Sequence, residues 1–258
     1  MALNVAYPKN ASVKDSVSAA EWQARVDLAA AYRFIAHKEW DGGIFNHLSL
    51  RVPDEPTYFL MKPNDLMFDE VTASNLKKLD MKGPPQGFAE NINAAGFTIH
   101  SAVLNARPDL MAVVHIHTAI GEAISARKNG FRCLTQGSMK FYNRLGYHDF
   151  EGVAEEPGEC ERLSADLSQH KALMLRNHGL LTCGRNMSEA VGNMSDLMGA
   201  AEAQLRIEAT GAEINEVPPE VCEKAARQFE AFFQRSQNRT EWAALLRQMD
   251  KVDSSYRN

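Results

Sequence analysis

The apolar run Met111-Ala-Val-Val-His-Ile-His117 limits the possible folds more than any other segment of the chain. It is short, compact and bounded by polar residues, which predicts a buried β-strand. Further short strands are predicted at 48–52, 58–61, 172–175 and 180–183. Helices are predicted at about 18–38, 94–106, 118–127 and 188–210. Strands interspersed with helices in this way favour a layered α/β architecture.

Local signals mark the ends of some helices. Ser18-Ala-Ala-Glu21 is a capping-box pattern, in which the serine and the glutamate each satisfy a free amide at the start of the first helix. Gly211 suits the left-handed conformation that ends a long helix. The stretch 63–89 contains several helix and strand breakers and is expected to be rich in loops, whereas the tail from Pro218 onward is expected to be helical.

Length, charge and cysteine usage narrow the class of protein. At 258 residues we expect one domain over 1–258, with a core of about 21–212 and a C-terminal helical extension over 213–258. The net charge of −5, without a basic block, argues against nucleic acid or an anionic membrane as the main partner. No apolar run approaches the roughly 18 residues of a membrane helix. The four cysteines form no CxxC pair, which is typical of a reducing compartment, so we expect a cytoplasmic protein.

His115 and His117 lie two residues apart in the predicted buried strand. Side chains alternate across a strand, so both imidazoles leave on one face. A lone buried histidine is most simply a hydrogen-bonded core residue. Two neutral imidazoles in one apolar layer both need partners, however, and the pair therefore indicates half of a metal site.

The third candidate ligand is His178, in the turn Arg176-Asn-His-Gly179 that directly follows a predicted strand. Three neutral imidazoles are a normal ligand set for zinc and leave one position open for water or substrate. The same nitrogens also suit iron, manganese, cobalt or nickel. The spacing alone therefore indicates a divalent metal ion without naming it, and among these ions we expect zinc first.

Several segments, taken in order, resemble the class II aldolase/adducin superfamily, and the resemblance covers about residues 21 to 212. It implies a three-layer α/β/α fold with a central mixed sheet flanked by helices, assembly as a homotetramer, and His115, His117 and His178 as the metal ligands. The matching segments are Phe45-Asn-His-Leu-Ser-Leu-Arg51, Asn93-Ala-Ala-Gly-Phe-Thr-Ile-His-Ser-Ala102, Ala106-Arg-Pro-Asp109, Val113-Val-His-Ile-His-Thr118, Gly146-Tyr-His-Asp-Phe-Glu-Gly152 and Leu175-Arg-Asn-His-Gly-Leu180.

One motif departs from the sugar-phosphate aldolases of this superfamily. Those enzymes carry Pro-Ser-Ser-Glu, where the glutamate transfers a proton and the serines help to hold the substrate phosphate. This chain has Asn93, Ala94, Ala95 and Gly96 instead, so it lacks the general base at that position. The pattern is closer to the adducin-like branch, whose adducins are cytoskeletal proteins without catalysis.

The retained histidines still favour an enzyme. Our first hypothesis is a metal-dependent lyase, of decarboxylase or aldolase type, that cleaves a carbon–carbon bond in a small carboxylate or aromatic acid. A three-histidine non-haem iron oxygenase is the second, and a non-catalytic adducin-like assembly module is the third. The predicted partners are a small-molecule substrate and further copies of the chain.

Six other residues are candidates. Asn46 and Ser49 match a strand that contacts substrate in relatives, and Arg176, beside His178, can pair either with a substrate carboxylate or with a neighbouring subunit. His100, Tyr147 and His148 are candidate catalytic proton donors, although His148 also suits a structural role. By contrast, His47 has no motif of its own and is expected to be exposed or at a helix end.

The tetramer has one further sequence argument. Met194, Leu197, Met198 and Ala201 form an apolar stripe at helical spacing along the helix at 188–210. Such a stripe packs either against another subunit or against the core of its own subunit. We take it as a candidate interface.

Overall fold

The computed structural model describes residues 12–83, 91–152, 157–236 and 239–258. One seven-stranded mixed sheet forms its centre, with the strand order β3-β2-β1-β4-β7-β6-β5. Neighbouring strands are antiparallel except for β5 and β6, which are parallel. The strands are β1 (His47–Val52), β2 (Glu55–Met61), β3 (Lys77–Asp80), β4 (Ala112–Ile116), β5 (Leu145–His148), β6 (Ala172–Leu175) and β7 (Gly179–Gly184).

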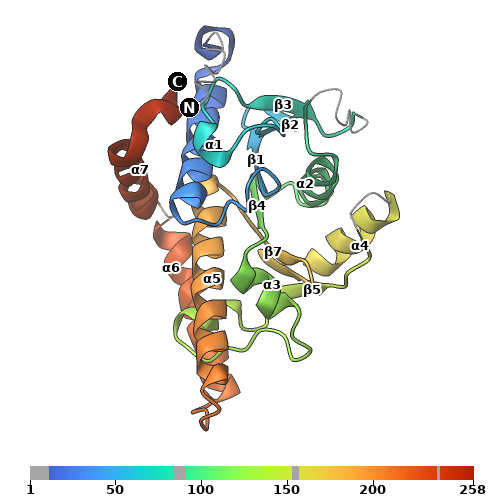
Figure 1. Ribbon diagram of the computed structural model, residues 1–258, viewed down its shortest axis with the longest axis vertical. Helices are drawn as coiled ribbons and strands as arrows, with labels where there is room; N and C mark the ends of the chain where they lie inside the picture. The colour runs from blue at the N-terminus through green and yellow to red at the C-terminus, as the bar shows by residue number, and fades with distance from the viewer. Residues whose placement is uncertain (1–11, 84–90, 153–156, 237–238) are drawn as a thin grey trace, which may run out of the picture.

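Helices cover both faces of this sheet, as Figure 1 shows. Residues of α1 and α5 pack with one face of the strands in one apolar cluster, and residues of α2 and α4 pack with the other face in a second cluster. This is the expected three-layer α/β/α arrangement. The helices are α1 (Ala19–His37), α2 (Ala94–Ala106), α3 (Ala119–Ser125), α4 (Pro157–Leu167), α5 (Met187–Ala209), α6 (Pro219–Ser236) and α7 (Arg239–Asp253).

Strand β4 lies at the middle of the sheet and is buried along its whole length, as predicted. Val114 and Ile116 contribute to the cluster on the α1 and α5 side, whereas Val113 contributes to the cluster on the α2 and α4 side. The alternation therefore points His115 to the α2 and α4 side. The strand ends at Ile116, so His117 is the first residue beyond it.

Three elements were not predicted from the sequence: β3, β5 and α4. Strand β3 has the sequence Lys-Lys-Leu-Asp and forms an edge of the sheet. Charged side chains are common on edge strands, but they carry no apolar alternation. Strand β5 is only four residues long and contains Gly146. Only the part of the predicted loop-rich stretch 63–89 up to residue 83 can be compared, because 84–90 lie outside the described residues.

The predicted helix ends are only partly as expected. Ser18 caps α1 by accepting a hydrogen bond from the Glu21 amide at 3.0 Å. The predicted reciprocal hydrogen bond from the Ser18 amide to the Glu21 side chain is wrong, because the Glu21 carboxylate instead pairs with Arg25 and Lys78. Gly211 has the predicted left-handed conformation, with φ +67°. The tail forms α6 and α7, as predicted.

The apolar stripe on α5 belongs to the core of its own subunit. Met194, Leu197, Met198 and Ala201 are each at most 2% exposed and lie in the cluster shared with α1 and the sheet. The interpretation of this stripe as a subunit interface is therefore wrong, and the oligomer prediction rests on the family resemblance alone. None of the described helices has the length and apolar character needed to cross a membrane.

Candidate metal centre

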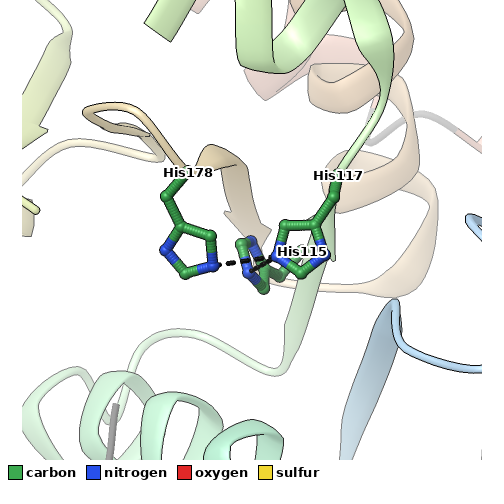
Figure 2. A group of neighbouring side chains, drawn as sticks. All are labelled: His115, His117 and His178. Carbon is green, nitrogen blue, oxygen red and sulfur yellow. Dashed lines mark hydrogen bonds between the residues drawn. The ribbon is translucent and has the colours of Figure 1, made fainter. Parts of the chain in front are cut away.

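Three imidazoles converge at one end of the central strands, as Figure 2 shows. Nε2 of His117 lies 2.9 Å from Nε2 of His115 and 2.9 Å from Nε2 of His178. One ligand nitrogen from each histidine lies within 4.8 Å of those of the other two. The structure thus brings together the three histidines that the sequence predicts as ligands.

The sheet topology explains why these residues meet. Strand β7 pairs with β4 on one side and with β6 on the other. The tight turn between β6 and β7, which carries His178, therefore lies beside the end of β4. Gly179 permits this approach, because a Cβ there would lie 2.7 Å from the Ile116 carbonyl oxygen and 3.1 Å from Cδ2 of His117.

Asn46 holds the backbone of His117 in place. Its Oδ1 accepts a hydrogen bond from the His117 amide at 2.9 Å. Its Nδ2 donates to the Trp40 carbonyl at 2.8 Å and to the His117 carbonyl at 3.4 Å. The side chain is 1% exposed. Asn46 thus positions a candidate ligand, and its predicted contact with a substrate stays a prediction.

The protonation of the three imidazoles suits a cation. Nδ1 of His115 lies 3.0 Å from the Leu180 carbonyl oxygen. A carbonyl can only accept, so His115 carries its proton on Nδ1 and leaves Nε2 bare toward the other two rings. Burial lowers the pKa of all three rings, that of His115 well below its ordinary value and that of His178 to about 4. All three imidazoles are therefore neutral near pH 7, and a divalent ion fits the converging lone pairs.

A second group of polar side chains lies behind this cluster. His47 pairs with His115 across β1 and β4, and its Nδ1 lies 2.8 Å from Nε2 of His100. Nδ1 of His100 in turn forms a short hydrogen bond with Oγ of Ser49. The prediction that His47 is exposed or at a helix end is wrong, because it is a buried strand residue, 4% exposed.

His100 and Ser49 are completely buried. Neither lines the cavity beside the three histidines. Both lie behind His47, and their predicted roles toward a substrate stay predictions. Strand alternation was the signal that could have found His47, because it puts His47 and Ser49 on the same face of β1.

A cavity of about 370 Å³ opens beside the three histidines. His47, Glu122, Phe45 and Phe150 are among the residues that line it. Phe45 and Phe150 are 63% and 56% exposed, and the Phe150 ring centroid lies 6.3 Å from that of His178. Among the described lining residues there is neither lysine nor arginine. The described wall of the cavity therefore offers no cationic side chain to pair with a phosphate group.

Position 96 lies against the ring of His47. A Cβ at Gly96 would lie 2.8 Å from Cδ2, 3.0 Å from Cγ and 3.1 Å from Nε2 of His47. The Gly96 amide donates at 2.8 Å to Oδ1 of Asn93, which caps α2. The imidazole of His47 therefore occupies the space that the side chain of a glutamate at this position would enter.

The other predicted site residues lie outside the cavity wall. The Tyr147 hydroxyl accepts from the Phe131 amide at 3.0 Å. Arg176 lies over the Tyr147 ring at 4.6 Å and pairs with Asp149 at 3.2 Å. Nδ1 of His148 lies 2.8 Å from the Asp166 carboxylate. These contacts account for the three side chains locally, and their roles toward a substrate stay predictions.

Comparison with known proteins agrees with this geometry. Residues 26–205 match the model of the family described as the class II aldolase and adducin N-terminal domain. A protein of Pseudomonas aeruginosa, provisionally named an aldolase class 2 protein, is 44% identical over 252 residues, which is 96% of each chain. Rat alpha-adducin is 38% identical over 186 residues, which is 70% of this chain but only 25% of that protein.

Solved structures give the same result. An aldolase II superfamily protein from Pseudomonas syringae superposes with a TM-score of 0.90 and 41% identity, covering 95% of this chain and 99% of that one. An L-fuculose 1-phosphate aldolase from Glaciozyma antarctica superposes with a TM-score of 0.77 and 26% identity, covering 98% and 97% of the two chains.

Proposed function

The chain belongs to the class II aldolase and adducin family, and we propose that it is a divalent-metal-dependent lyase that cleaves a carbon–carbon bond in a small carboxylate or aromatic acid. The observation that carries this proposal is the convergence of His115, His117 and His178 beside a cavity. A purely structural module has no need for three neutral imidazoles that meet at one point. Zinc is our first choice of metal because zinc commonly takes three histidine ligands with one open position.

Decarboxylation is the form of this chemistry that the residues favour. The bond to the carboxylate carbon breaks, carbon dioxide leaves, the electron pair stays on the substrate, and a proton takes the vacated position. No base has to remove a proton first, which agrees with glycine at position 96. A divalent ion held by the three histidines would supply Lewis-acid stabilisation of that electron pair.

The chain's own residues would orient the substrate and supply the proton. Phe45 and Phe150 offer apolar surface at the cavity for the body of an acid. Apart from the three candidate ligands, Glu122 and His47 are the ionisable side chains among the described residues that line the cavity. Glu122 is therefore a candidate donor of the final proton, in addition to the sequence candidates His100, Tyr147 and His148, which are not among the lining residues.

Metal content tests the foundation of this proposal. The purified protein is expected to hold close to one divalent ion per chain, measured by elemental analysis. His117→Ala should lose most of that metal, because it removes one of three ligands. The matched control His170→Ala should keep it, since His170 lies outside the cluster. Equal metal content in the two variants would refute the ligand assignment.

Turnover tests the reaction itself. Protein loaded with zinc, manganese, cobalt or iron is incubated with a panel of aromatic and keto acids, and carbon dioxide release and oxygen consumption are followed together. Release of carbon dioxide without oxygen uptake is the expected result. Oxygen uptake only with iron would instead favour the three-histidine oxygenase, and a native protein without metal would favour the assembly module.

We also propose that the chain forms a homotetramer in the cytoplasm, as the family resemblance implies. Light scattering at micromolar concentration is expected to give a mass of several times the 28.7 kDa of one chain. A mass close to that of one chain would contradict this prediction.

A further inference from the structure

The hydrogen atoms of the buried group Ser49, His100 and His47 can be assigned from its contacts. Within the described residues, Oγ of Ser49 has one hydrogen-bond partner, Nδ1 of His100. Ser49 is completely buried. If its hydroxyl accepted this bond, its own hydrogen would stay buried without an acceptor, which is costly. Ser49 therefore donates, and Nδ1 of His100 is bare.

The hydrogen positions of His100 and then of His47 follow from this donor. A hydrogen bond between two ring nitrogens needs one N–H group as donor and one unprotonated nitrogen as acceptor. His100 is bare at Nδ1 and must carry its hydrogen on Nε2, which donates to Nδ1 of His47 at 2.8 Å. His47 consequently carries its own hydrogen on Nε2.

Nε2 is the ring nitrogen of His47 that is left to face the cavity. His47 lines the cavity beside the three candidate ligands, and its Nδ1 is taken by His100. Among the described residues no hydrogen bond is made by Nε2 of His47, and this atom borders the space above Gly96. The ring thus offers one fixed N–H group at the position where the related aldolases carry a proton-abstracting glutamate.

We propose that His47 is a substrate-contacting hydrogen-bond donor, whose Nε2–H binds an oxygen of the substrate, and that His100 and Ser49 are positioning residues that fix this tautomer. The nature of the substrate rests on the proposed function, but the tautomer does not. A neutral imidazole with a fixed N–H stabilises negative charge that develops on an oxygen, and it removes no proton.

The Nε2–H donor of His47 explains why the site combines this histidine with glycine at position 96. An imidazole with hydrogen on Nε2 has no lone pair there, so it cannot act as the general base that the glutamate provides. It can stabilise the oxygen of an enolate that forms when carbon dioxide leaves. Gly96 is required in this arrangement because any Cβ would collide with the His47 ring.

The tautomer can be measured directly. Protein with ¹⁵N-labelled histidine, free of metal, is examined by NMR of the imidazole nitrogens, with His47→Gln used to assign the His47 signals. We expect His47 to carry hydrogen on Nε2. Ser49→Ala should make both tautomers of His47 visible, because it removes the donor that fixes them. Hydrogen on Nδ1 of His47 in the unmodified protein would overturn the proposal.

Binding tests the contact. Oxalate, used as a small dianion that binds metal, is titrated into the zinc-loaded protein by calorimetry. His47→Leu is expected to weaken binding by about 10- to 100-fold, as for a lost hydrogen bond to a charged group. His47→Gln keeps an N–H donor at a similar reach and should stay within about 3-fold of the unmodified protein, and zinc content should match in all three proteins. Equal oxalate affinity of the leucine variant and the unmodified protein would overturn the contact.

A second variant keeps the proposal testable if the first one does not fold. If His47→Leu does not fold, Ser49→Ala takes its place and is expected to weaken oxalate binding with zinc content unchanged. Unaltered affinity in that variant would count against the positioning role. Failure of the lyase proposal would look different: no acid would be turned over, while the tautomer and the oxalate contact would remain as expected.

Discussion

L-Fuculose 1-phosphate is expected to be cleaved at least about 10²-fold more slowly than by an aldolase that retains its glutamate, because a general base contributes about 10²–10⁴-fold. The base is replaced by Gly96, and the two serines of the aldolase motif are replaced by Ala94 and Ala95. The described lining of the cavity also lacks a lysine or arginine to bind phosphate. Release of dihydroxyacetone phosphate, followed with a coupling enzyme, measures the rate.

Ribulose 1-phosphate, whose cleavage releases the same dihydroxyacetone phosphate, serves as a second substrate, and the Glaciozyma aldolase provides the positive control. The protein is tested with each divalent metal, so that a low rate cannot result from the wrong ion. Robust cleavage of either sugar phosphate by the unmodified protein would contradict both this prediction and the role assigned to position 96.

Restoring the glutamate alone should not restore aldolase activity. In Gly96→Glu the new Cβ would lie 2.8 Å from Cδ2 of His47, so the ring or α2 must shift before the carboxylate can reach the cavity. Gly96→Ala is the matched control, because it adds the same Cβ without a carboxylate. Both variants are expected to lower the melting temperature similarly, and neither should gain sugar-phosphate cleavage. A tenfold gain in sugar-phosphate cleavage in Gly96→Glu, but not in Gly96→Ala, would show that the His47 ring moves aside at little cost.

The convergence of the three histidines could be predicted from the sequence because each part has a local signal. The pair His115 and His117 is two residues apart at the end of an apolar strand, and His178 lies in a turn bounded by Gly179. Period-two alternation and turn chemistry are read over a few residues, so they do not depend on knowing the tertiary structure.

The cavity wall could not be predicted, because it is assembled from distant segments. The segment with Phe45 and His47, the residue Glu122 and the residue Phe150 come from three different parts of the chain and meet only through the order of the strands. An exposed phenylalanine carries no sign of its role in one sequence, and strand alternation places His47 on the face of Ser49 without showing that this face borders a cavity. The same limit explains the wrong interpretation of the α5 stripe, since helical spacing shows that a face is apolar but not what covers it.

Buried histidines also make the metal-free protein sensitive to mild acid. Burial holds the pKa of His47, His100 and His115 well below the ordinary value near 6.5. Above pH 6.5 these rings are neutral in both the folded and the unfolded chain, so they leave the free energy of unfolding unchanged. Below pH 6.5 the unfolded chain takes up protons that the folded chain excludes, so stability falls as the pH falls.

The expected effect is large. A fully excluded proton lowers the free energy of unfolding by about 1.4 kcal/mol per pH unit, so the three rings together lower it by at most about 4 kcal/mol per unit below pH 6.5. Domains are typically stable by about 5–15 kcal/mol, so the metal-free protein should be measurably less stable at pH 5.5 than at pH 7.5. Urea denaturation at pH 7.5, 6.5 and 5.5 measures this slope.

Two variants show whether the buried rings cause the slope. His100→Gln removes one of the three titrating groups, and it is expected to reduce the slope by about 1.4 kcal/mol per pH unit even if it lowers stability at every pH. His37→Gln changes an exposed ring at the end of α1 and should leave the slope unchanged. Bound metal should raise stability at neutral pH and be released as protons compete for its ligands. A metal-free protein equally stable at pH 7.5 and 5.5 would mean that these three rings take up protons while the chain stays folded.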